Sequence, residues 1–297
     1  MGPETAHPAA PEARPILAAD GVSLACRVVP AQRPAPRANV VYLHGIQSHG
    51  GWYVDTAAEL ARRGYAVYLP DRRGSGRSGG VRGHFAGWDQ LVDDVRRVVD
   101  SAHRDAPERP TVLVGGCWGA RPAVAFAARH EADLAGLALV CPAVKVKVDL
   151  PALDKLRVVL GRAVSPTRPV RIPLTPEMFT SNPRWLEFVR TDPLSLRTVS
   201  ARFFWETMRS NRFLARRAPL SLPMLLLQSG ADPIVDAAGV RSWFDGVAPV
   251  GARRTLYPTF GHILDFEEER RRYWDDLVGW LDATVAPARR APEASLA

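Results

Sequence analysis

The stretch that most constrains the fold spans residues 111–121 and reads TVLVGGCWGAR. A β-branched apolar run ends in two glycines, presents Cys117, and continues through Gly119 into a segment with helical character. The spacing G-x-C-x-G is typical of a sharp strand-to-helix turn that presents a nucleophile. Side chains two residues before and after such a turn would collide across it, and Gly115 and Gly119 avoid that collision. We therefore predict a strand, a strained turn at Cys117, and a helix.

Apolar strands alternate with helical segments along most of the chain. Runs at 39–45, 65–70 and 134–141 are continuously apolar, as expected for strands buried on both faces of a parallel sheet. Helical spacing is present at 54–63, 91–103 and 237–247, and a closing helix is expected up to about Thr284. The predicted fold class is α/β, with a mostly parallel, doubly wound sheet in one catalytic domain. Two β-prone runs within 14–30, joined at Asp20-Gly21, predict an N-terminal hairpin.

Three motifs occur in the order and spacing of a known family. They are HGIQSHGGWY at 44–53, RGYAVYLPDRRGSGRSGGVRGHFAGWDQLVDDV at 63–95, and the cysteine turn itself. Together they resemble the monoglyceride-lipase and serine-aminopeptidase branch of the α/β-hydrolases. The resemblance implies an α/β-hydrolase core at 14–144 and 218–285, with a helical cap inserted at 145–217. Within the cap, short helical stretches are expected at 153–160, 185–189 and 196–209. Residues 1–13 and 286–297 are rich in proline and alanine and are predicted to be disordered tails.

The order of the candidate catalytic residues fits the same family. In α/β-hydrolases the nucleophile is followed by an acid after a late strand and then by a histidine beyond the last strand. Cys117, Asp232 and His262 have this order, because Asp232 follows LLLQSGA and His262 follows RRTLYPTFG. His262 would accept the thiol proton, and Asp232 would fix the tautomer of the imidazole. Asp236 is the alternative acid, and His44 is the alternative base.

Two backbone amides are predicted to form an oxyanion hole. In this architecture the loop after a central strand and the residue after the nucleophile each supply one N–H, which assigns the role to Ile46 and Trp118. The alternative for Ile46 is an ordinary glycine-rich loop. His44 and Arg121 are the candidate substrate-binding residues. Arg121, one helical turn beyond Cys117, would bind a substrate carboxylate or phosphate, or else pair with a buried Asp or Glu.

Cysteine at the nucleophile position, where the family normally has serine, leaves three functions open. In the first, Cys117 forms an acyl-thioester that is passed on to an amine or thiol, as in polyhydroxyalkanoate synthases and aminoacyl shuttles, with coenzyme A or carrier-protein thioesters as donors. In the second, the chain is a plain hydrolase of carboxylic esters, lipids or thioesters. In the third, it is a non-catalytic binding protein of the same fold. The sequence favours acyl transfer from a small-molecule ester or thioester.

The composition of the chain limits the kinds of molecule that it is expected to bind. The net charge of +8 comes almost wholly from arginine and indicates either an acidic partner or a coding bias. The arginines are dispersed without interleaved aromatics, so no nucleic acid is expected. No apolar run has the length of a membrane span, no signal peptide is recognisable, and Cys26, Cys117 and Cys141 form no disulfide framework. We therefore predict a cytoplasmic enzyme. Because the chain has neither metal-ligand nor redox C-x-x-C spacing, we also expect no metal and no cofactor.

Overall fold

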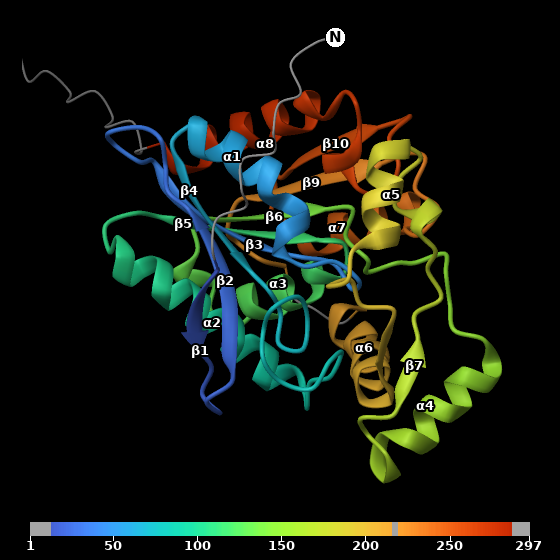
Figure 1. The fold of residues 1–297 in the computed structure, drawn as a ribbon. Helices are drawn as coiled ribbons and strands as arrows, with labels where there is room; N and C mark the ends of the chain where they lie inside the picture. Colours follow the sequence, from blue (N-terminus) through green and yellow to red (C-terminus); the bar gives the residue numbers. More distant parts are fainter. Residues whose placement is uncertain (1–12, 216–218, 287–297) are drawn as a thin grey trace, which may run out of the picture.

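Eight strands form one sheet in the computed structural model, which describes residues 13–215 and 219–286 (Figure 1). The strand order is β1-β2-β4-β3-β5-β6-β9-β10, in which β2 pairs antiparallel with β1 and β4 and all other neighbours are parallel. The strands are β1 (Ala13–Leu17), β2 (Ser23–Val29), β3 (Ala38–Leu43), β4 (Tyr65–Pro70), β5 (Thr111–Gly116), β6 (Gly136–Val140), β9 (Met224–Ser229) and β10 (Arg253–Tyr257). The predicted mostly parallel, doubly wound sheet is confirmed.

Helices cover both faces of the sheet. Helices α1 (Val54–Arg62) and α8 (Arg270–Val285) contact each other on one face, and α2 (Trp88–Asp105) and α3 (Ala120–Ala127) contact each other on the other (Figure 1). Helix α7 (Ala237–Val247) packs against β9. The spacing of buried residues explains these contacts, since Leu91, Val95 and Val98 recur on one side of α2. Within the described ranges, no helix has both the length and the apolarity to cross a bilayer.

The structure differs from the sequence prediction at three places. The predicted tails lie outside the described residues except at their inner ends, and Ala13 already begins β1. The helix predicted at 196–209 is wrong at its start, because residues Thr198–Ser200 form strand β8, which pairs with β7 (Pro169–Arg171), and helix α6 (Ala201–Ala215) follows. Cys141, expected within a strand, instead follows β6 in a left-handed conformation with φ +43°.

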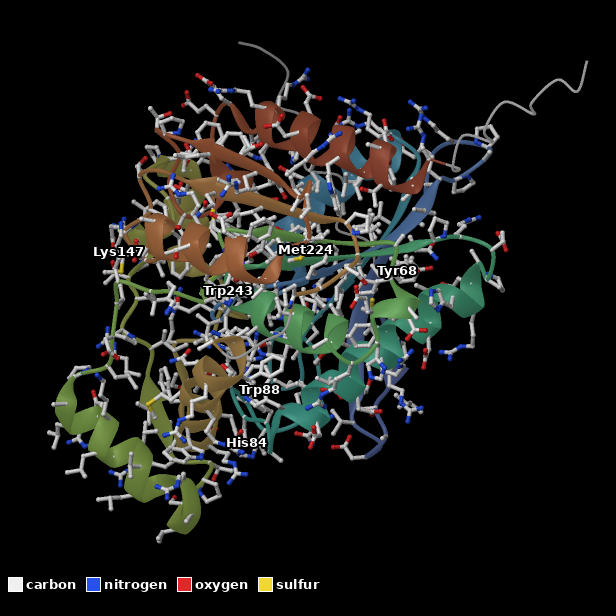
Figure 2. All side chains as sticks on the ribbon, turned by 180° about the vertical axis from the view of Figure 1, so that it is seen from behind. Tyr68, His84, Trp88, Lys147, Met224 and Trp243 are labelled. Carbon is white, nitrogen blue, oxygen red and sulfur yellow. The ribbon has the colours of Figure 1, made fainter. Side chains whose placement is uncertain are left out.

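The connection between β6 and β9 contains the predicted cap, 145–217. It carries α4 (Ala152–Val164), β7, a 3-10 turn at Pro176–Met178, α5 (Pro183–Thr191), β8 and α6, and its described strands stay outside the large sheet. Hydrogen bonds fix it to the core near His84 and Trp88, which Figure 2 labels. The Trp88 indole N–H donates to the Glu206 carbonyl at 2.8 Å, and His84 Nδ1 lies 2.9 Å from Ser200 Oγ. These contacts hold α6 beside the carboxyl end of β5.

Candidate active site

The turn at Cys117 has the strained geometry that its glycines predict. Cys117 has φ +50°, a left-handed conformation that is unfavourable for a non-glycine residue, and its side chain is only 4% exposed. The helix passes so close to the end of β5 that a Cβ on Gly115 would lie 2.6 Å from the Cα of Ala120. Position 115 therefore requires glycine. A Cβ on Gly119 would lie 2.3 Å from the carbonyl oxygen of Leu43. Gly119 is thus needed because the turn packs closely against the end of β3, and not because a side chain would collide with the other side of the turn.

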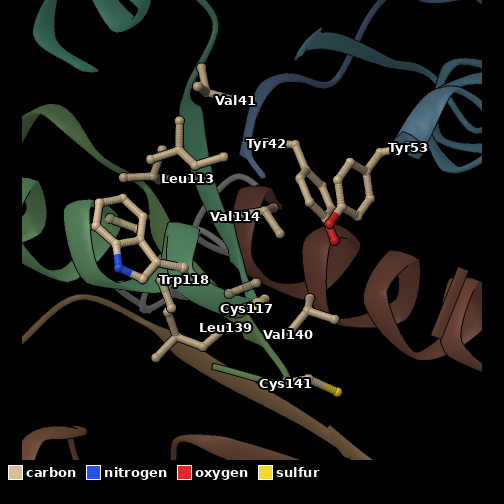
Figure 3. Packing of buried hydrophobic residues seen from close by; sticks show 14 of the residues in the cluster. Val41, Tyr42, Tyr53, Leu113, Val114, Cys117, Trp118, Leu139, Val140 and Cys141 are labelled. Atoms are coloured by element: carbon tan, nitrogen blue, oxygen red, sulfur yellow. The ribbon is translucent and has the colours of Figure 1, made fainter. Parts of the chain in front are cut away.

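Cys117 sits in a tightly packed layer at the carboxyl end of β5. Figure 3 shows it with Trp118 on one side and the Tyr42 and Tyr53 rings on the other. These two tyrosine rings stack with their centroids 4.6 Å apart. The loop after β3 passes directly over the sulfur, since a Cβ on Gly45 would lie 3.4 Å from Cys117 Sγ. The thiol is therefore enclosed by the elements that the sequence assigned to the oxyanion hole.

Asp232 and His262 are paired beside this thiol. His262 Nδ1 lies 2.7 Å from Asp232 Oδ2, and both side chains are buried. The other carboxylate oxygen, Oδ1, accepts the backbone N–H groups of Ile234 at 2.8 Å and Val235 at 2.9 Å. Three hydrogen bonds thus hold the carboxylate, and the imidazole is left with Nε2 as its free nitrogen. Asp236, the alternative acid, precedes α7 and is not the residue that pairs with His262.

The pKa of His262 depends on burial and on two neighbours, Cys117 and Asp232. Burial alone would lower the pKa of the imidazole, but the negative charges of a Cys117 thiolate and Asp232, with their hydrogen bonds, outweigh it and raise the pKa to about 10. His262 Nε2 is buried and makes no hydrogen bond of ordinary geometry to the described residues. Cys117 and His262 are therefore close enough to interact electrostatically without a well-aligned hydrogen bond. Alignment on substrate binding is common for such pairs.

The loop after β3 is held by a residue that the sequence analysis did not single out. Arg72 donates from Nη1 to the Gly45 carbonyl and from Nη2 to the Ile46 carbonyl, both at 3.0 Å. The Gly45 carbonyl belongs to the same peptide group as the Ile46 N–H, so Arg72 fixes the direction of that amide. The guanidinium also lies 4.8 Å from the Trp118 ring. In the sequence this residue is one of four arginines in 72–82, and nothing local distinguishes it.

His44 does not occupy the position expected of a base or a substrate-binding residue. Its Nδ1 lies 2.8 Å from the Gly45 carbonyl, and its Nε2 accepts the backbone N–H of Arg72 at 2.9 Å. Because Nε2 is an acceptor, Nδ1 carries the proton and donates to Gly45. Burial, reinforced by the charge of Arg72, lowers the pKa of His44 well below its usual value, so the ring is neutral. The prediction for His44 is therefore wrong, and both nitrogens serve the loop.

The two residues predicted to supply the oxyanion donors, Ile46 and Trp118, border the same cavity as Cys117. The Ile46 amide donates to no described residue, and Trp118 follows Cys117 in the first turn of the helical segment, where amides lack intrahelical acceptors. Trp118 itself is anchored by its ring. Its indole N–H donates to Thr207 Oγ1 at 3.2 Å, and it stacks on Phe203 with centroids 4.7 Å apart. These contacts fix the position of the residue that follows Cys117.

A cavity of about 150 Å³ opens above Cys117. Ile46, Trp118 and Arg121 also border it. Most of its remaining wall is apolar and comes from the strand ends and the predicted cap: Ala143, Val146, Val148, Leu150, Ile172, Pro173, Leu174, Phe204, Met208 and Ile234. Thr207, Asp149 and Asn211 add polar groups. Within the described part of the chain, no group of three His, Cys, Asp or Glu side chains could hold a metal ion.

With the described residues, Arg121 does not form the buried ion pair that was one of the two alternatives for it. Its guanidinium pairs with no described Asp or Glu, so the expected buried ion pair is absent from this part of the chain. Nε donates to the Ala143 carbonyl at 2.8 Å, and Nη1 donates to Ser210 Oγ at 2.6 Å, Asn211 Oδ1 at 2.8 Å and the Thr207 carbonyl at 3.3 Å. The side chain therefore joins α3 to α6 through neutral acceptors.

Comparison with known proteins identifies the family of this arrangement. Residues 34–269 match the model of the serine aminopeptidase family S33. The chain is 30% identical over 251 residues to a monoacylglycerol lipase of Mycolicibacterium smegmatis, covering 83% of this chain and 88% of the relative. It is 26% identical over 284 residues to the human monoglyceride lipase, covering 93% and 92% of the two chains.

Solved structures agree on the fold. A soluble variant of the monoglyceride lipase of Saccharomyces cerevisiae, in complex with a substrate analogue, superposes with a TM-score of 0.82 at 18% identity, covering 96% of this chain and all of that one. A monoacylglycerol lipase of Paleococcus ferrophilus gives a TM-score of 0.75 at 22% identity, covering 88% and 99%. The chain therefore has the α/β-hydrolase fold and belongs to the serine aminopeptidase (S33) family.

Proposed function

We propose that this chain is a carboxylic-ester hydrolase of the lipase and esterase type, and that it acts through a covalent acyl intermediate on Cys117. The observation that carries the proposal is the 2.7 Å contact between His262 Nδ1 and Asp232 Oδ2, which leaves Nε2 free to interact with Cys117, a residue that borders the cavity. Membership of a hydrolase family, with two lipases among the relatives, supports ester hydrolysis over the acyl transfer that the sequence favoured.

In the acylation step, Cys117 transfers its proton to His262 Nε2, and the sulfur attacks the ester carbonyl carbon. The carbonyl oxygen becomes an oxyanion, which the N–H groups of Ile46 and Trp118 stabilise. Asp232 accepts the Nδ1–H of the imidazolium and stabilises its charge. When the C–O bond breaks, Nε2–H protonates the alkoxide, and the alcohol leaves an acyl-cysteine behind.

In the deacylation step, water enters from the cavity and attacks the thioester carbon. His262 Nε2 accepts the proton of the water as the new C–O bond forms, and the same two amides bind the second oxyanion. The C–S bond then breaks, the carboxylic acid leaves, and the proton returns to the sulfur. The apolar wall of the cavity suits an ester whose acyl portion is apolar near the carbonyl.

Acyl transfer is the second candidate, and the cysteine favours it. An acyl-cysteine is itself a thioester, so its exchange with an incoming thiol is nearly balanced in energy. Thioesters also react readily with amines. Coenzyme A or a carrier-protein thioester would be the donor for this reaction. The two candidates share the same intermediate and differ only in the acceptor, which makes them separable in one experiment.

The test measures the covalent intermediate directly. The parent protein, Cys117→Ala and Cys26→Ala are incubated with a p-nitrophenyl ester, a monoacylglycerol and an acyl-coenzyme A, and intact-protein mass and product are followed. We expect ester hydrolysis and an acyl adduct in the parent and in Cys26→Ala, because Cys26 lies in β2, away from the cavity. Cys117→Ala should lose both.

Two outcomes would redirect the proposal. Hydrolysis that persists unchanged in Cys117→Ala would refute a cysteine nucleophile. Product that accumulates only after an amine or thiol is added, with an adduct stable in water, would favour acyl transfer over hydrolysis. A parent protein that forms neither adduct nor product with any of the three donors would point to the non-catalytic function.

A further inference from the structure

One charged side chain on the wall of the apolar cavity forms no ion pair with any Asp or Glu that the structure describes. Arg121 is 4% exposed and lies one helical turn after Cys117, on the wall of the same cavity. Burial lowers the pKa of its guanidinium, partly offset by a Cys117 thiolate, to about 10, so the group remains charged at neutral pH. An uncompensated buried cation is unfavourable unless the site normally holds an anion or enough neutral acceptors.

The neutral acceptors use only part of the guanidinium. Nε and Nη1 make all of its hydrogen bonds to the described residues, and Nη2 makes none. Nη2 is not fully enclosed, and Arg121 borders both the cavity above Cys117 and the adjoining cavity. An arginine has donors only, and both N–H groups of Nη2 are therefore available to an acceptor that enters with a substrate.

Asn211 contributes a second donor at the same place. Its Oδ1 accepts the hydrogen bond from Arg121 Nη1 at 2.8 Å, which orients the amide so that Nδ2 is the free end. Asn211 borders the cavity above Cys117 and the adjoining cavity that Lys145 and Trp243 line. Two residues with an unused hydrogen-bond donor, one of them cationic, thus border the cavity that contains the thiol.

We propose that Arg121 and Asn211 form a subsite for a carboxylate at the far end of the acyl group, so that the preferred substrates are monoesters of dicarboxylic acids. This inference rests on the proposed ester hydrolysis and names its substrate class. A carboxylate carries the single charge that one guanidinium matches and fits a cavity of about 150 Å³ more easily than a phosphate. The acyl chain would run along the apolar wall between Cys117 and the subsite.

The other charged groups around the two cavities do not cancel this subsite. Asp149 borders both cavities, but its side chain is 70% exposed and is paired with Lys155. Lys145 adds positive charge at the adjoining cavity. The competing explanation is that Arg121 only ties α6 to the core. That role would make Arg121 important for stability but would give no discrimination between a charged and a neutral acyl group.

The experiment compares two p-nitrophenyl esters that share the same five-carbon glutaryl chain. Mono-p-nitrophenyl glutarate carries the free carboxylate, and p-nitrophenyl methyl glutarate carries it capped as a methyl ester. We expect kcat/KM of the parent protein to be at least tenfold higher for the free acid. Asn211→Asp places a carboxylate beside Arg121 and should reduce that ratio to about one, and Arg121→Gln should do the same. Arg129→Gln, a surface change just beyond α3, is the matched control and should keep the ratio.

Asn211→Asp keeps the test decisive if Arg121→Gln fails to fold, because Asn211 is an exposed residue. Equal kcat/KM values in the parent protein, or a preference for the free acid that survives in Asn211→Asp, would overturn the subsite. Binding of free glutarate, measured by calorimetry, separates this inference from the proposed function. Glutarate binding that Asn211→Asp abolishes, without hydrolysis of either ester, would refute hydrolysis and keep the subsite.

Discussion

Replacing Gly119 by alanine isolates one contact on which the geometry of the nucleophile turn depends. Gly119 has φ −60° and ψ −18°, a conformation that alanine adopts without strain, so the substitution changes only what the new methyl group touches. That methyl group would lie 2.3 Å from the Leu43 carbonyl oxygen and 2.5 Å from the His44 carbonyl oxygen. To reach even 3.0 Å, the turn and the end of β3 must separate by at least about 0.7 Å.

Both clashing atoms belong to the backbone, so no side chain can rotate away. We expect destabilisation near the upper end of overpacking effects, about 3 kcal/mol. In a chain of this size that corresponds to a fall in Tm of roughly 6–12 °C. The separation also pulls the turn away from the loop that carries Ile46. A displacement approaching 1 Å at reacting groups lowers catalytic efficiency by about 100-fold.

The assay combines thermal unfolding with ester hydrolysis, and Gly279→Ala is the matched control. Gly279 is an exposed residue in the middle of α8, and a Cβ there would meet nothing within 4 Å. That variant should gain about 0.5–1 kcal/mol from helix propensity and keep full activity. A Gly119→Ala protein with unchanged Tm and unchanged hydrolysis would refute the argument that close contact with β3 requires glycine here.

Two further predictions follow from buried charged groups. Burial, only partly offset by the hydrogen bond from Thr56, raises the pKa of Asp265 to about 7. Between about pH 4 and 7 the folded protein therefore retains a proton that the unfolded chain has released. The contribution of Asp265 to the free energy of unfolding falls as the pH rises through that range. The Tm of Asp265→Asn relative to the parent protein should therefore increase from pH 5 to pH 8, whereas a constant difference would contradict the assignment. Arg72→Met should lower kcat for ester hydrolysis by about 10- to 100-fold with little change in KM, because it releases the peptide that carries the Ile46 N–H. Arg77→Met, at an exposed position of the same loop, is its control, and equal kcat values for the two variants would exclude a positioning role for Arg72.

Local patterns determined much of the fold in advance. The helix predicted at 237–247 is α7 with the same bounds, because apolar spacing and its flanking residues are local signals. By contrast, the helix predicted over 196–209 loses residues 198–200 to β8, whose partner β7 lies about thirty residues earlier. Pairing of short strands depends on tertiary context, which overrides the local helical propensity.

The candidate site likewise contains features that the sequence predicted and features that only the tertiary structure revealed. Glycine spacing and the residue order of the α/β-hydrolase family predicted Cys117, Asp232 and His262 as a set, because strand ends at one edge of a parallel sheet converge. In the structure Asp232 and His262 are paired. Nothing in the sequence indicated that His44 would donate to its own loop and accept from Arg72, or that Arg121 would find neutral acceptors on α6, about ninety residues away. The chain itself determined which residues reach the site, because strand ends are set by local signals. Only the tertiary structure decided their partners, since hydrogen-bond donors and acceptors meet across elements that no local pattern connects.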